Sequence, residues 1–107
     1  MNRYPMSFCF DFGGTCIWDK KEGCGIPNDR LSNQLPITSG LILELMELSD
    51  IYETSIDWDY PPAPSPWTRE QAIDFLNRAN AAYDQLVEEL GEKYEIVNEA
   101  YKNVNLE

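Results

Sequence analysis

Histidine is absent from this 107-residue sequence, and basic residues are scarce. Without histidine, the chain lacks the commonest acid–base catalyst of enzymes and a frequent protein ligand of metals. Eight lysines and arginines stand against nineteen aspartates and glutamates, which gives a net charge of −11. Binding to nucleic acid needs basic side chains that displace counterions, so this charge disfavours a nucleic-acid partner. It favours a positively charged protein partner, although acidity also serves solubility alone.

Long apolar runs are missing as well, and cysteines are few. No segment approaches the roughly 20 apolar residues of a membrane-spanning helix, and the start of the chain has no apolar core of a secretory leader. The three cysteines, an odd number, are Cys9, Cys16 and Cys24. Zinc ligands usually pair at about two to four residues, which is closer than these cysteines lie. We therefore expect reduced thiols in a cytoplasmic protein that binds no membrane, metal or cofactor.

The first third of the sequence predicts a β-hairpin followed by a loop. Residues 6–12 alternate between apolar and smaller or polar side chains, as in a strand with one buried face. Two glycines then precede a second β-prone run at residues 15–19, which favours a two-residue turn that places Phe10 opposite Ile17. Residues 20–34 are rich in glycine, asparagine, aspartate and serine, and we expect them to form a loop.

The rest of the sequence predicts two helices and one more strand. Apolar periodicity and capping residues favour helices over residues 38–52 and from residue 65 or 68 to Leu90, joined by a proline-rich turn. Residues 93–98 are typical of a strand, and residues 99–107 are expected at the surface or frayed. The chain is thus expected to form a single α+β domain over residues 1–107, in which two helices pack on a small antiparallel sheet.

One side of the first helix combines acidic and apolar residues, which suggests a protein interface. The proline-rich turn that follows adds two aspartates, together with tryptophan and tyrosine side chains. Aromatic side chains are frequent anchors in interfaces, and prolines reduce the conformational entropy lost on binding. The candidate partner-binding residues are Leu43, Met46, Glu47, Asp50, Asp57, Asp59 and Tyr60.

Two motifs that could carry other chemistry have simpler interpretations. Residues 11–15, Asp-Phe-Gly-Gly-Thr, are similar to the first phosphate loop of sugar kinases and actin-like ATPases. The chain is too short for that fold and has no second glycine-rich phosphate loop, so we expect a hairpin turn here. Asp57 and Asp59 lack the further oxygen ligands and the turn glycine of a calcium loop. We therefore predict no catalytic residues and no metal site.

Residues 35–97 resemble small bacterial immunity proteins of polymorphic-toxin or contact-dependent growth inhibition systems. The motifs that carry the resemblance are Leu35-Pro36-Ile37-Thr38, Tyr52 with Ser55-Ile56-Asp57-Trp58, Pro61, Pro64-Ser65-Pro66-Trp67-Thr68, Glu70, Phe75, Glu89-Leu90-Gly91 and Tyr94-Glu95-Ile96-Val97. The resemblance implies a non-enzymatic protein that binds a cognate toxin domain, often a basic nuclease, and covers its active site. It assigns no contact residues, because these vary with the toxin. An acidic DNA mimic that inhibits a DNA-binding enzyme is the alternative.

Overall fold

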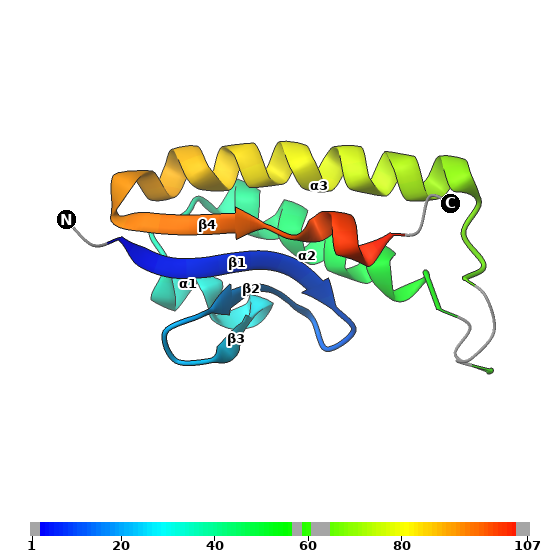
Figure 1. The fold of residues 1–107 in the computed structure, drawn as a ribbon, viewed down its shortest axis with the longest axis horizontal. Helices are drawn as coiled ribbons and strands as arrows, with labels where there is room; N and C mark the ends of the chain where they lie inside the picture. Colours follow the sequence, from blue (N-terminus) through cyan, green and yellow to red (C-terminus); the bar gives the residue numbers. More distant parts are fainter. Residues whose placement is uncertain (1–2, 57–58, 61–64, 105–107) are drawn as a thin grey trace.

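The computed structural model describes residues 3–56, 59–60 and 65–104. These residues form an α+β fold in which a four-stranded mixed sheet packs against two long helices (Figure 1). The strands are β1 (Tyr4–Asp11), β2 (Thr15–Asp19), β3 (Cys24–Pro27) and β4 (Tyr94–Asn98). The α-helices are α1 (Leu31–Gln34), α2 (Ser39–Glu53) and α3 (Arg69–Leu90). The short 3-10 helices are η1 (Asn28–Arg30), η2 (Gly91–Lys93) and η3 (Ala100–Asn103).

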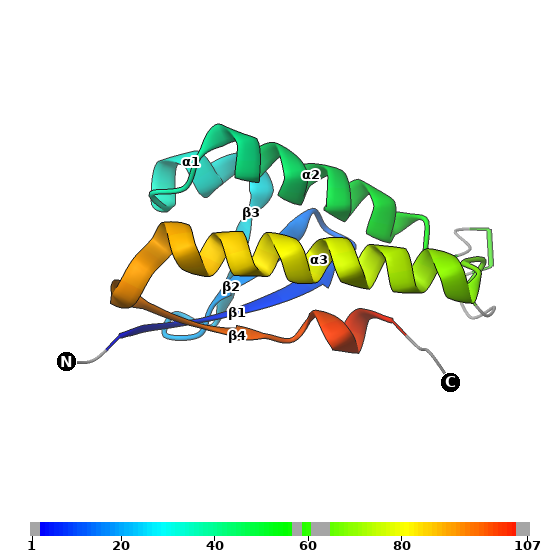
Figure 2. The same cartoon turned by 90° about the horizontal axis from the view of Figure 1, so that it is seen from above.

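The sheet has the order β3-β2-β1-β4, and its last strand corrects the predicted topology. β4 joins the hairpin as expected, but it runs parallel to β1, with Tyr94 beside Tyr4 and Asn98 beside Phe8. The prediction of an antiparallel sheet is therefore wrong for this strand. The physical reason is the crossover through α2 and α3: the 22-residue helix α3 returns the chain to the end of the sheet where β1 begins (Figure 2).

The hairpin between β1 and β2 forms as predicted, but its register differs. Ile17 lies opposite Phe8 rather than Phe10, because the turn has one residue more than expected and β1 contains an irregularity between Phe8 and Asp11. The turn between Asp11 and Thr15 has three residues instead of two, and of its glycines only Gly14 has a positive φ, at 77°. Such a three-residue turn with a glycine at its end is a common hairpin connection.

The predicted loop at residues 20–34 contains regular structure. β3 pairs with β2 and places Ile26 opposite Ile17, and both side chains are buried. Gly25 is needed in β3, because a Cβ there would lie 2.6 Å from the Thr15 side chain. Leu31 in α1 is fully buried. The sequence analysis missed β3 because its residues are typical of turns. The stability of β3 comes from pairing with β2 rather than from the β-propensity of its own residues.

The two long helices begin where their capping residues predict. The Thr38 side chain accepts a hydrogen bond from the Leu41 backbone N–H at the start of α2. Thr68 and Gln71 form the expected capping box of α3. Gly91 follows the last residue of α3 with a positive φ of 72° and a ψ of −158°, so its backbone lies outside the left-handed helical region.

Residues 99–104 are part of the fold rather than a frayed end. Ala100 in η3 is fully buried, and Val104 packs against the core. The Asn103 side chain accepts a hydrogen bond from the Phe10 backbone N–H and donates one to the Phe10 carbonyl, both at 2.8 Å. The expectation of a loose surface segment is therefore wrong, since one polar side chain ties this segment to β1. Residues 105–107 lie outside the described part of the chain.

An aromatic cluster joins the sheet to both long helices. The Phe10 ring of β1 lies 6.0 Å from the Tyr52 ring of α2 and 5.0 Å from the Phe75 ring of α3, measured between centroids. Trp67 closes this cluster 5.1 Å from Phe75, and its indole N–H donates to the Thr54 hydroxyl at 2.7 Å. The Trp67 end of the predicted proline-rich turn thus has a structural role, while residues 57–58 and 61–64 of that turn lie outside the described residues.

Candidate functional site

The outward side of α2 carries four of the seven predicted partner-binding residues on neighbouring turns. They are Leu43, Met46, Glu47 and Asp50, spaced three or four positions apart along the helix. The opposite side of α2 buries leucines and Tyr52 in the core, which fixes the orientation of the helix. As a result, Leu43 is 66% exposed, Met46 is half-buried, and both acids are exposed. We refer to these four residues as the α2 surface.

The remaining predicted residues follow the C-terminal end of α2. Asp59 and Tyr60 are exposed, and the Tyr60 side chain has 64% of its surface accessible. Asp57 lies outside the described residues. The sequence predicts one surface that continues from the helix into the turn; the structure shows that its described residues are exposed or half-buried, and their role in binding stays a prediction.

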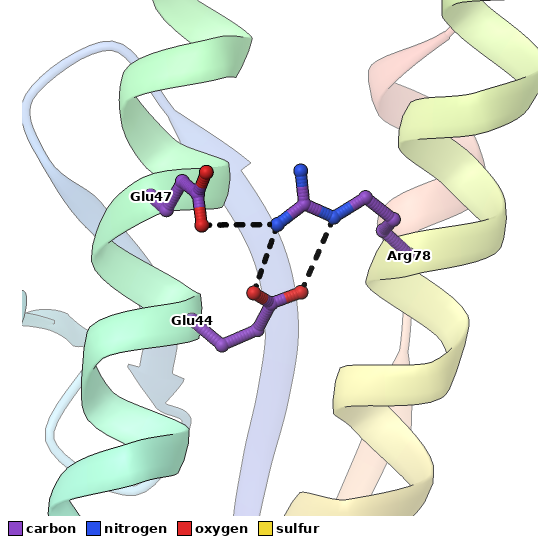
Figure 3. Close-up of polar contacts among 3 residues, drawn as sticks. All are labelled: Glu44, Glu47 and Arg78. Atoms are coloured by element: carbon purple, nitrogen blue, oxygen red, sulfur yellow. Dashed lines mark hydrogen bonds and ion pairs between the residues drawn. The ribbon is translucent and has the colours of Figure 1, made fainter.

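Arg78 of α3 binds two glutamates of α2, a feature that the sequence analysis missed. Its guanidinium donates to Glu44 through Nη2 at 2.8 Å and through Nε at 3.3 Å, and Nη2 also donates to Glu47 at 3.1 Å (Figure 3). The hydrogen bond to Glu44 is the main cause that raises the pKa of Arg78, and Glu47 adds to it. The side chains remain partly exposed, so this ion pair stabilises the packing of α2 on α3 only modestly. Glu47 is therefore both a surface residue and a link between helices.

A hollow of about 350 Å³ adjoins the α2 surface. None of the described residues that line it belongs to α3. Three segments line it: the β1–β2 turn with Gly13 and Gly14, the junction of β3 and η1 with Asp29, and α2 with Met46 and Asp50. Asp29 and Asp50 are both exposed. No lysine or arginine is among the described residues that line the hollow, so its electrostatic character is negative.

Buried polar side chains form the floor of the hollow. The side-chain amide of Asn28 donates from Nδ2 to the Ser49 hydroxyl at 2.7 Å, and the Cys16 thiol lies 3.5 Å from Oδ1 of the same amide. Asn28 and Ser49 are 7% and 3% exposed, and Cys16 is fully buried. Burial raises the pKa of the Cys16 thiol to about 12, so this thiol stays protonated and can donate to Asn28. These contacts join β2, η1 and α2 and hold the floor in one arrangement.

The family of the chain follows from a comparison with protein-family models. Residues 6–100 match the family described as Serratia CdiI immunity protein-like. The chain belongs to this family. No curated protein matches the chain. The family match extends beyond the resemblance at residues 35–97, because it includes most of β1 and all of β2 and β3.

Membership of an immunity-protein family of contact-dependent growth inhibition systems implies a cognate toxin as partner. It names no contact residues, so the α2 surface remains a prediction. No helix in the described part of the chain is long and apolar enough to cross a membrane. The glycine pair at residues 13–14 lines the hollow together with Asp29 and Asp50, whose carboxylates would repel a phosphate group.

Sequence reasoning missed Arg78 and Asp29 as neighbours of the candidate surface. Nothing in the sequence indicates that the Arg78 side chain lies beside Glu44 and Glu47 of another helix. Asp29 is part of a predicted loop, and it lines the same hollow as Asp50 because β3 and η1 place it there. A weak signal was available in Pro27-Asn28-Asp29, whose residue types are typical of a defined turn.

Proposed function

We propose that this protein binds a cognate toxin domain through the α2 surface and neutralises it by covering the toxin's active site, without catalysing any reaction. Asp59 and Tyr60 extend the proposed contact region beyond the helix. The toxin domain is a basic protein, and its activity is that of a nuclease. The observation that carries this proposal is the exposure of Leu43 within an acidic helix surface of a member of an immunity-protein family.

The α2 surface has the composition of a protein interface. A single exposed leucine is ordinary on a protein surface. Here, however, Met46 lies one turn further along the helix, and Glu47 and Asp50 border the two apolar side chains. Apolar anchors inside a charged rim are typical of interfaces, in which the anchors supply most of the affinity and the charges set specificity.

The charge of the protein supports a basic nuclease as its target. Enzymes that cleave nucleic acid bind its phosphates with lysine and arginine side chains, so their substrate sites are positively charged. A partner with a net charge of −11 is attracted to such a site and, once bound, blocks access of the nucleic acid. Electrostatic attraction of this kind mainly speeds association and weakens as salt concentration rises.

The α2 surface favours toxin binding over the DNA-mimic alternative. A mimic of DNA presents a series of carboxylates to a phosphate-binding surface. Glu44 and Glu47 instead share the Arg78 guanidinium, and Leu43 lies exposed beside them. This mixture of partly neutralised carboxylates and apolar surface fits a protein contact better than a row of phosphate mimics does.

The test is a binding measurement with the domain encoded by the gene immediately upstream, where we expect the cognate toxin. We expect a stable one-to-one complex and loss of the toxin's nuclease activity at equal concentrations. Leu43→Asp should weaken binding about 30-fold or more, because it places a charge at an apolar anchor. Asp50→Lys should slow association, most strongly at low salt.

The control is Asp74→Lys, which makes the same charge change at an exposed position of α3 outside the α2 surface. Glu47→Lys is unsuitable as a first test, because it also breaks the contact with Arg78. If the native chain forms no complex with the upstream toxin, the proposed function is wrong. If the complex forms but Leu43→Asp and Asp50→Lys bind like Asp74→Lys, the toxin contacts another surface.

A further inference from the structure

The hollow beside α2 is an open depression that combines negative charge with a preorganised floor. Its volume of about 350 Å³ is roughly ten times the share of one water molecule in liquid water, about 30 Å³. That is enough room for a long side chain of another protein. The two glycines in the β1–β2 turn keep one wall free of side chains.

The walls of the hollow suit the two parts of a long cationic side chain. The half-buried Met46 offers an adaptable apolar surface for the methylene groups. Asp29 and Asp50 offer carboxylates, from two different segments, for the charged end. Neither aspartate forms a salt bridge within the described part of the chain. Both carboxylates are thus placed to accept hydrogen bonds from a partner.

The floor does not compete for the charged end of such a side chain. The Asn28 amide already donates to Ser49, and its carbonyl oxygen faces the Cys16 thiol. Because these groups have partners and are buried, they need not rearrange when the hollow is filled, which lowers the cost of binding.

We propose that the hollow between the β1–β2 turn, η1 and α2 receives one lysine or arginine side chain of the toxin, whose cationic group is held by Asp29 and Asp50. This inference rests on the proposed function, and it names the group on the toxin that the immunity protein recognises. It adds the residues Gly13, Gly14 and Asp29 to the contact region, beyond the α2 surface that the sequence predicted.

Two variants of the immunity protein test this from opposite directions. Asp29→Asn with Asp50→Asn removes the charge and keeps the shape, and it should weaken binding to the upstream toxin domain about 30-fold. Gly13→Tyr keeps the charge and narrows the hollow. An added Cβ at Gly13 meets no atom within 4 Å, and the φ of Gly13 is not positive, so the fold should accept this side chain.

Asp74→Asn with Asp84→Asn is the matched control, because it removes two negative charges from exposed positions of α3. It should change affinity less than about threefold. Thermal unfolding of each variant shows whether the fold is kept. If Gly13→Tyr does not fold, the charge variant and its control still decide the matter.

Substitution of each lysine and arginine of the toxin to methionine identifies the occupant and distinguishes the two residue types. One of these substitutions should weaken binding to the native immunity protein and have no further effect on the Asp29→Asn, Asp50→Asn variant. The inference is overturned if the native complex forms but both hollow variants bind as tightly as the control. It is also overturned if every toxin substitution weakens binding to the Asp29→Asn, Asp50→Asn variant as much as it weakens binding to the native immunity protein. Absence of any complex with the native chain overturns the proposed function itself, and this inference with it.

Discussion

The Asn103→Ala substitution should destabilise the whole fold, although it removes only one partly buried amide. Asn103 makes two hydrogen bonds with the backbone of Phe10, one as acceptor and one as donor, both at 2.8 Å. Phe10 lies in the irregular part of β1, between Phe8 and Asp11, where regular pairing with β2 is interrupted. On the other side, pairing with β4 ends at Phe8. The amide thus replaces a strand neighbour that β4 does not provide.

The expected loss of folding stability follows from the two hydrogen bonds that Asn103→Ala removes. A neutral hydrogen bond contributes about 1 kcal/mol to stability, and a buried backbone group left without a partner costs about 1–3 kcal/mol. Because the two Phe10 groups are only partly buried, we expect a loss of about 2–3 kcal/mol from a total stability on the order of 5–15 kcal/mol. For a domain of this size, the melting temperature should fall by about 10 °C.

Urea unfolding followed by tryptophan fluorescence measures this loss directly. The Trp18 indole donates to the Cys9 carbonyl at 2.8 Å, next to Phe10, so its emission should report on this part of β1. Tyr101→Ala is the control, because Tyr101 lies in η3 beside Asn103 but is 61% exposed. That control should cost about 0.5 kcal/mol or less. A loss below about 0.5 kcal/mol for Asn103→Ala would refute the reasoning.

The Asn103→Asp variant adds a pH-dependent check. Its carboxylate can still accept from the Phe10 N–H, but its second oxygen would face the Phe10 carbonyl, and two acceptors repel. This repulsion raises the pKa of the new carboxyl in the folded state above its unfolded value. The destabilisation is then largest above the folded pKa, and it is relieved as the pH falls through that pKa, because the protonated carboxyl can donate. Asn103→Ala should show no such relief relative to the native chain.

Three further predictions concern the helices and the thiols. Glu89→Gln should destabilise the protein by about 1 kcal/mol at pH 7, because Glu89 accepts hydrogen bonds from the Thr38 backbone N–H and hydroxyl. These bonds lower the pKa of Glu89 below its usual 4.5. The contribution of Glu89 to folding stability is therefore fully present above pH 4.5. In acid unfolding curves, the difference in stability between variant and native chain should shrink as the pH falls through the lowered pKa of the folded state. Arg78→Gln should cost about 1 kcal/mol in urea unfolding at low salt and less at about 1 M salt, because its ion pairs are partly exposed. Mass spectrometry after alkylation should find Cys24 labelled quickly and Cys16 only on unfolding, since Cys24 is exposed and Cys16 is buried with a pKa of about 12; rapid labelling of Cys16 in the folded protein would contradict its burial.

Local signals were sufficient to predict the helices. The capping threonines, Thr38 and Thr68, act on backbone groups three residues away, so their effect can be read from neighbouring positions in the sequence. The apolar period of α2 also predicted which side is buried. Because the buried side of α2 was predicted correctly, the exposure of Leu43 and Asp50 on its opposite side was predicted as well.

Features that depend on distant parts of the chain could not be predicted in this way. The direction of β4 depends on the path of α3, and β3 is stabilised by pairing with β2 rather than by its own residues. Asn103 contacts a residue 93 positions earlier in the chain, and the sequence around it is typical of a loose end. For the site, the same limit applies to the hollow, which three separate segments line.

The Arg78 ion pair changes how the acidity of α2 should be understood. In the sequence, Glu44, Glu47 and Asp50 form one acidic side, and each would contribute equally to attraction of a basic partner. In the structure, one guanidinium is shared by the two glutamates and offsets part of their charge, whereas Asp50 lies at the hollow with Asp29. The negative potential offered to a partner is therefore shifted towards the hollow end of the helix surface. Net charge accounts for attraction over distance, and this local asymmetry is what can orient the toxin once it arrives.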